Sequence, residues 1–165
     1  METKLLSIYL NDHLAGATAG AALARRAAGS NRGDPTYQSA LETLAQEIAE
    51  DRASLLAIMG ELNIATDRVK QALACAAERT GRLKLNGRLL GYSPLSRLDE
   101  LELLALAVTG KQTLWRTLHF LVPWEPRLDH EQIEELRARA EKQLQEIEAC
   151  RRRAAGDAFV QAETQ

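Results

Sequence analysis

The sequence predicts an all-α protein, a five-helix antiparallel bundle with a long linker between the third and fourth helices. Ala, Leu, Glu, Arg and Gln, which are strong helix formers, dominate the 165 residues. Few segments are rich in Val, Ile, Thr and aromatic residues, so strands have little support. Apolar residues recur at helical spacing in stretches that turn-forming residues separate. We expect a single domain over residues 1–155 and a frayed tail over 156–165.

The first two helices are expected to form a hairpin. The first spans about Thr3–Ala28, and small residues fill its middle at Ala15–Ala22. Such a stretch lets another helix approach closely, and it also leaves space for something else. In the turn that follows, Asp34 suits the N-cap of the second helix and Pro35 suits its first position. The second helix ends near Asn63 and, after so short a turn, should pack antiparallel to the first.

A third helix and an unusual linker are expected next. Thr66 and Asp67 can cap the helix, which ends near Leu83. The linker over residues 84–95 is apolar and basic, with Asn-Gly, a second Gly and Ser-Pro as punctuation. We expect this linker to cross the bundle and pack against it, and it is a secondary candidate for a binding surface.

Two long helices complete the expected bundle. Ser96 suits the N-cap of the fourth helix, and the prolines at positions 123 and 126 stop it. Asp129 suits the N-cap of the fifth, which ends near Ala155. One side of the fifth helix is dense in Glu, Arg and Lys, as expected of a solvated face.

Composition limits the classes of function. The formal net charge of −2 argues against a nucleic-acid partner bound mainly through phosphate contacts. The isolated Cys75 and Cys150 form neither a CxxC motif nor a disulfide framework, which favours a reducing compartment. We find no stretch that suits a signal peptide or a membrane span, so we expect a cytoplasmic protein with no membrane partner.

The candidate site is a pair of acids on the apolar seams of the first hairpin. Asp12 interrupts the stripe of the first helix, and Asp51 interrupts that of the second. Because both lie at similar distances from the turn, they are expected to face each other across the antiparallel pair. Glu47 lies one turn from Asp51, while His13 and Glu50 flank the seam. Carboxylates in a core are costly unless they are paired, protonated or bound to metal.

This layout resembles the ferritin-like superfamily, rubrerythrin and bacterioferritin relatives included. In that design two helices each supply a Glu, and two others each supply a Glu-x-x-His pair, to a di-metal centre. Glu47, Glu50 and Asp51 stand where the family places its Glu and His, and Asp12 and His13 stand where it has a single Glu. The resemblance covers most of the chain as architecture, but no Glu-x-x-His is present. It therefore implies a divergent member that lacks the full di-metal motif.

The resemblance also implies further ligands and a metal. Glu78 on the third helix and Glu102 on the fourth could come to similar heights, and Glu148 on the fifth is another candidate. The metal would be iron or manganese, and an oxidoreductase activity could then follow.

Three interpretations of the acid pair stay open. In the first, Asp12 and Asp51 bond to Tyr9, His13, an arginine or buried water and specify the register of the bundle. In the second, they bind metal. In the third, one seam is shifted by a single position, so that one acid faces solvent.

The function expected from the sequence is a non-catalytic binding or assembly role without a cofactor. Long amphipathic helices favour self-association through helical faces, or a protein partner. Tyr92, Trp115 and Trp124 are expected to cluster near the linker and the turn between the last two helices, where an exposed aromatic patch would mark an interface. The sequence leaves open whether the protein is an enzyme, and metal-carboxylate binding is the alternative.

Overall fold

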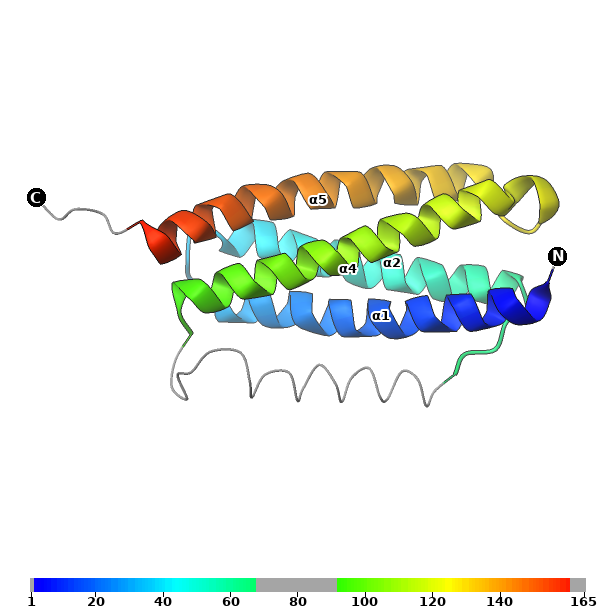
Figure 1. Cartoon of the computed structure of the whole chain (residues 1–165), viewed down its shortest axis with the longest axis horizontal. Coiled ribbons are helices and arrows are strands. Elements are labelled where there is room, and N and C mark those ends of the chain that lie inside the picture. The colour runs from blue at the N-terminus through cyan, green and yellow to red at the C-terminus, as the bar shows by residue number, and fades with distance from the viewer. Residues whose placement is uncertain (1, 68–91, 161–165) are drawn as a thin grey trace, which may run out of the picture.

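The computed structural model describes residues 2–67 and 92–160, which form an all-α bundle (Figure 1). Its elements are α1 (Thr3–Ser30), α2 (Gln38–Glu61), α4 (Pro94–Leu121), the short 3₁₀ helix η1 (Val122–Trp124) and α5 (His130–Phe159). The all-α prediction is confirmed, but the bundle described has four long helices rather than five. The predicted third helix and most of the linker lie outside the described residues.

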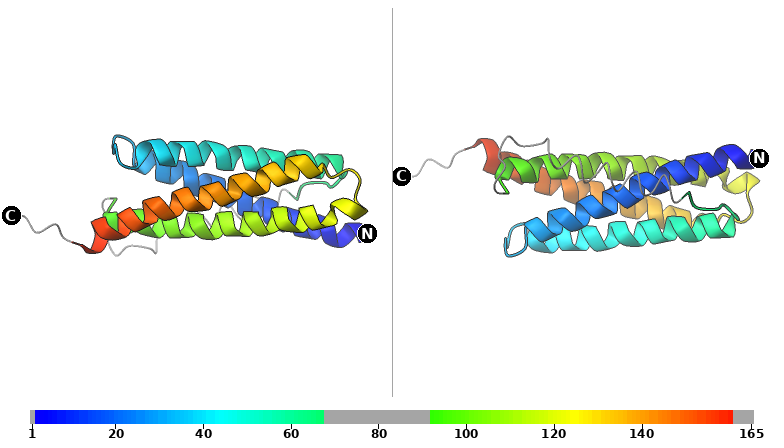
Figure 2. Two further views of the ribbon diagram at one scale, coloured as in Figure 1. Left: turned by 90° about the horizontal axis from the view of Figure 1, so that it is seen from above. Right: turned by 90° about the horizontal axis from the view of Figure 1, so that it is seen from below.

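The four helices form two antiparallel hairpins, α1 with α2 and α4 with α5 (Figures 1 and 2). The hairpins meet where α1 packs on α4 and α2 contacts α5, and these neighbours are also antiparallel. The helices α2 and α4 run in the same direction. No helix in the described part of the chain is long and apolar enough to cross a membrane.

The start of α2 differs from the prediction. The helix begins at Gln38, with Tyr37 at its N-cap, so the predicted roles of Asp34 and Pro35 in the cap are wrong. Asp34 instead closes a turn: its carbonyl accepts from the backbone N–H of Gln38 at 2.9 Å and its carboxylate accepts from that of Thr36 at the same distance. An Asp that bonds the N–H two residues ahead stabilises a turn as readily as it caps a helix.

The start of α4 also differs, and for a related reason. Ser93 is the N-cap instead of the predicted Ser96. Ser93 Oγ accepts from the Ser96 N–H at 3.1 Å, and Ser96 Oγ accepts from the Ser93 N–H at 3.3 Å. The two serines thus form a reciprocal capping box, and Pro94 occupies the first helical position that suits it.

The prediction for the start of α5 is confirmed. The side chain of Asp129 accepts from the N–H groups of Glu131 and Gln132 at 2.9 and 3.2 Å. The predicted end is wrong, because the helix continues through Gly156 to Phe159. Residues 156–159, which were expected in the tail, are therefore helical.

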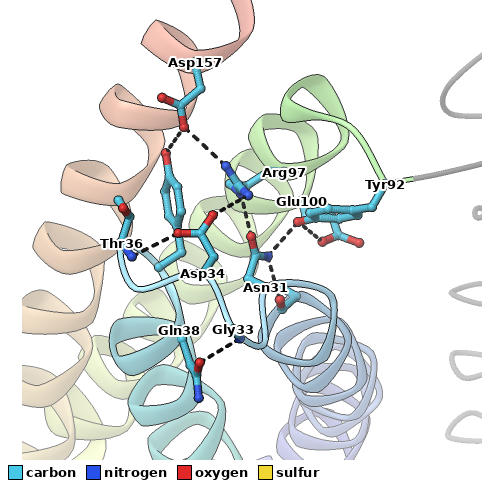
Figure 3. A network of polar contacts seen from close by, with 11 residues as sticks. Asn31, Gly33, Asp34, Thr36, Gln38, Tyr92, Arg97, Glu100 and Asp157 are labelled. Carbon is cyan, nitrogen blue, oxygen red and sulfur yellow. Dashed lines mark hydrogen bonds and ion pairs between the residues drawn. The ribbon is translucent and has the colours of Figure 1, made fainter.

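Arg97 links three segments of the chain at one end of the bundle (Figure 3). Its guanidinium donates to Asn31 Oδ1 at 2.5 Å, Asp34 Oδ2 at 2.9 Å and Asp157 Oδ2 at 3.2 Å. It also lies 4.0 Å from the ring centre of Tyr37. We call these five residues the Arg97 cluster. It joins the turn of the first hairpin to the start of α4 and the end of α5.

Within this cluster, the side chain of Tyr37 is fixed by burial and by a hydrogen bond. Its hydroxyl donates to Asp157 Oδ2 at 2.6 Å, and its side chain is buried. Burial, together with the Asp157 carboxylate, raises the pKa of Tyr37 to about 12. The neutral hydroxyl that donates to Asp157 is therefore the form the fold stabilises.

The predicted aromatic cluster does not form. Tyr92 lies just before α4 and bonds Asn31 and Glu100, whereas Trp124 lies beyond the opposite end of the same helix. Trp115 is buried, with 1% of its surface exposed. Because α4 alone is about 40 Å long, Tyr92 and Trp124 cannot contribute to one patch.

Candidate functional site

The two acids predicted to meet have different environments. Asp51 is buried, with 1% of its surface exposed, as predicted. Asp12 is exposed, so the prediction that it points into the core is wrong. The inward polar position on α1 belongs to Asn11, one residue earlier, between the buried Leu10 and Leu14. The α1 seam is thus shifted by a single residue, as the third interpretation allowed.

Asn11 is the buried polar residue of α1 that the sequence did not single out. Its amide donates to the carbonyl oxygens of Ser7 and Ala65, each at 3.0 Å. Its Oδ1 accepts from the N–H of Asp67 at 2.6 Å. These bonds hold the chain that follows α2 against α1, which is a structural role. The signal available in the sequence was an Asn on the same helical face as Ser7 and Leu14.

The partners of Asp51 come from the second hairpin. One carboxylate oxygen accepts from Lys111 Nζ and from Gln143 Nε2, the latter at 3.1 Å. The other oxygen lies 2.5 Å from a terminal nitrogen of Arg139. Gln143 also accepts from Lys111 and donates to Glu47 Oε2 at 3.0 Å. We call these five residues the Asp51 cluster, and they join α2, α4 and α5 in the middle of the bundle.

The Asp51 cluster contains as many acidic as basic side chains. Two carboxylates, Asp51 and Glu47, face two cationic side chains, Lys111 and Arg139. Burial lowers the pKa of Lys111, and the adjacent Asp51 carboxylate opposes this effect. Buried ions are tolerated when each has a partner. Asp51 therefore has the arginine contact that the structural interpretation named, and Lys111 in addition.

The other predicted ligands are dispersed. Glu50 lies 3.4 Å from Arg139, and Glu102 lies 3.7 Å from Arg151 on the surface. Glu148 pairs with Arg151 and Arg152 along α5. Glu78 lies outside the described residues. Glu50, Glu102 and Glu148 face arginines rather than one another.

The donor set around Asp51 does not fit the predicted metal centre as it stands. A divalent cation there would have to displace Lys111 and Arg139, the two cations already at the carboxylate. Within residues 2–67 and 92–160, no group of three or more His, Cys, Asp or Glu side chains is placed to hold a metal ion. Metal binding by Asp12, Glu47 and Asp51 stays a prediction.

A cavity of about 350 Å³ lies beside the Asp51 cluster. Residues of α1, α2 and α4 line it, and most of them are apolar. Asp12 and Gly16 line the cavity and are exposed, so they lie at its opening. Asp51, Lys111 and the buried Trp115 also line it. The cavity thus contains both acids of the predicted pair in its wall, one at the rim and one in the interior.

The small residues of α1 explain why a cavity exists here. At Gly20 the helices are in contact, since an added Cβ would lie 3.4 Å from the Cβ of Ala107 on α4. At Gly16, one turn earlier, an added Cβ would have no neighbour within 4 Å. Both readings of the small-residue stretch are therefore correct in part: close packing at Gly20 and open space at Gly16.

His13, another predicted ligand, lies in the same wall. Its ring contacts that of Tyr9 edge to face, with 4.5 Å between centroids. Burial lowers the pKa of His13 although Asp12 opposes the shift, so its imidazole is neutral at neutral pH.

No protein-family model matches the sequence, and no curated protein or solved structure matches it significantly.

Proposed function

We propose that this protein has a non-catalytic binding role and holds a small, largely apolar molecule in the cavity between α1, α2 and α4. The observation that carries the proposal is the cavity itself, about 350 Å³ in volume and open to solvent at Gly16. Ligand sites are typically concave and mostly apolar, with a few polar groups, in the range of about 300–1,000 Å³. This cavity meets each of those criteria.

The contacts of the wall favour binding over catalysis. Asp51 and Lys111 bond to each other, and Arg52 donates to Thr18 Oγ1 at 2.9 Å. A catalytic acid, base or nucleophile has to be within reach of a reacting atom, with a partner that activates it. Here the interior charged groups serve to hold helices together, which suits a passive pocket.

A bulky residue at Gly16 should block the cavity. Gly16→Phe should weaken binding of the neutral naphthalene dye Prodan by about tenfold or more, because the ring would occupy the open space at the entrance. Fluorescence titration measures the affinity.

Gly29→Phe is the matched control. Gly29 is also a glycine of α1 with nothing within 4 Å of an added Cβ, but it does not line the cavity. Its variant should bind the dye like the unmodified protein. Equal affinity in the unmodified protein and Gly16→Phe would rule out this cavity as the site.

Self-association is a second candidate function, because large apolar side chains are exposed at one end of the bundle. Phe120 and Trp124 are 66% and 61% exposed, and their ring centroids lie 5.0 Å apart. Leu5, near the start of α1, is 62% exposed. Exposed apolar side chains of this kind often mark an interface. We propose that a second copy of the chain covers it.

Sedimentation velocity at several concentrations tests the association. We expect a dimer or larger species that Phe120→Lys dissociates, since a charge would have to be buried in the interface. Phe159→Lys, at the far end of α5, is the control: Phe159 is 69% exposed and should not affect association. A monomer at every concentration would contradict the proposal.

The ferritin-like interpretation is the remaining alternative. Two antiparallel hairpins joined by one long connection are compatible with that topology. In this alternative the protein binds iron or manganese through Asp12, Glu47 and Asp51, after a rearrangement that frees Asp51 from its cations.

A further inference from the structure

We propose that His119 and His130 form a two-histidine site for a divalent transition-metal ion, best suited to Zn²⁺, between the end of α4 and the start of α5. Neither residue lines the cavity, so the inference goes beyond the binding function proposed above and does not depend on it. It also involves none of the acids of the ferritin-like alternative.

The turn between α4 and α5 brings the two imidazole rings together. His119 lies in the last turn of α4, next to the buried Leu118, and His130 is the first residue of α5. The Asp129 side chain caps α5, and the buried Ile133 anchors its first turn in the core. The backbone at both histidines is therefore held by the fold and not by the contact between the rings.

The separation of the two rings suits one shared ion. The Nε2 atoms of His119 and His130 lie 3.2 Å apart. Bonds from zinc to imidazole nitrogen are about 2.0–2.1 Å long, so an ion bonded to both atoms would have an N–Zn–N angle of about 103°, close to the tetrahedral value of about 109°. A hydrogen bond between the same atoms needs a proton on one nitrogen, whereas a metal ion uses the lone pair of each.

Solvent has access to complete the coordination of this ion. The His119 side chain is 35% exposed, and His130 is also exposed. Water occupies the positions of a zinc ion that the protein leaves open. Glu134 Oε2 lies 3.4 Å from His119 Nε2, but the same oxygen accepts from Arg137 at 2.6 Å. The site therefore has two protein ligands, with the Glu134 carboxylate as a nearby negative charge that favours a cation.

The ligand type selects the metal, and the position of the ligands gives the ion its role. Imidazole nitrogen suits Zn²⁺, Cu²⁺ and Ni²⁺, whereas Mg²⁺ and Ca²⁺ prefer oxygen ligands. An ion bonded to both rings would link α4 to α5 beside their turn. Because the folded chain would bind it better than the unfolded chain, the ion should stabilise the fold.

Isothermal titration calorimetry of the full chain with zinc chloride tests the site. We expect one Zn²⁺ per chain, bound about tenfold or more weakly in His119→Ala and in His130→Ala, because each variant removes a ligand. His13→Ala is the matched control, since His13 is the remaining histidine of the chain and lies in the cavity wall. It should bind zinc like the unmodified protein. The proposal would be wrong if the unmodified protein bound no zinc, or if neither His119→Ala nor His130→Ala weakened the binding.

Thermal unfolding distinguishes an ion shared by both rings from zinc held by one histidine. The two residues are eleven positions apart along the chain, so only the folded state fixes the distance between their rings. Zinc should raise the Tm of the unmodified protein and of His13→Ala, but not that of His119→Ala or His130→Ala. An equal rise in the last two variants would overturn the assignment of the pair. Circular dichroism before zinc is added checks that they are helical, and His119→Gln or His130→Gln replaces one that is not.

Discussion

Asp51→Ala should lower the free energy of unfolding by about 3 to 5 kcal/mol, whereas Asp12→Ala should lower it by less than about 1 kcal/mol. The first variant leaves Lys111, already buried, without its carboxylate, and it deprives Arg139 of its closest contact. The second alters a side chain on the exposed surface of α1. Urea denaturation followed by circular dichroism measures both changes.

The two losses of unfolding free energy can be compared directly, because Asp51 and Asp12 are the same amino acid in the wall of one cavity. Equal losses of stability would contradict the different environments of the two acids. A double variant tests whether the loss of stability comes from the broken pair with Lys111 rather than from any substitution at position 51. Asp51→Leu combined with Lys111→Met should cost less than the sum of the single changes, because each removes a partner that the other needs.

The same two variants test the metal alternative. If the protein binds iron or manganese through both acids, elemental analysis of protein purified without chelator should find near-stoichiometric metal that either substitution removes. If the cluster is structural, only the unfolding free energy of Asp51→Ala should change strongly.

The helices could be predicted because their signals are local. Apolar spacing placed α1, α2, α4 and α5, and the Asp129 cap needs only the next three residues. The error at the start of α2 arose because Asp34 closes a turn instead of capping the helix, and the error at the start of α4 arose because two residues could each serve as the cap. Ser93 and Ser96 both suit that position, and the local sequence supports either.

The site was predictable only in part, because its geometry depends on tertiary packing. Neighbouring residues on a helix differ by about 100° in direction, so the adjacent polar residues Asn11 and Asp12 compete for one inward position. The pattern of α1 alone could not decide between them. The inward position of Asp51 was predicted correctly because this residue stands alone among apolar neighbours on its stripe.

The partners of Asp51 could not have been identified from the sequence. Lys111 and Gln143 come from α4 and α5, and only the packing of one hairpin on the other brings them to α2. The cavity likewise required the relative placement of Gly16 and α4.

Arg97→Ala should lower the free energy of unfolding by about 2 to 4 kcal/mol, the second largest effect we expect. Its guanidinium bonds two acidic side chains and Asn31, and its side chain is only 15% exposed. The substitution removes contacts that hold the turn of one hairpin against both helices of the other. Arg97→Lys should recover only part of the loss, since an ammonium cannot reproduce the planar fork or stack on Tyr37 in the same way.

Arg32→Ala is the control for this prediction, since Arg32 is exposed in the same turn and should contribute less than about 0.5 kcal/mol. Similar losses for Arg97→Ala and Arg32→Ala would contradict the role of the Arg97 cluster. Residues 97 and 111 are about 20 Å apart along α4, so the Arg97 and Asp51 clusters share no partner. The effects of Arg97→Ala and Asp51→Ala should therefore add in the double variant to within about 0.5 kcal/mol, which would identify two independent ties between the same two hairpins.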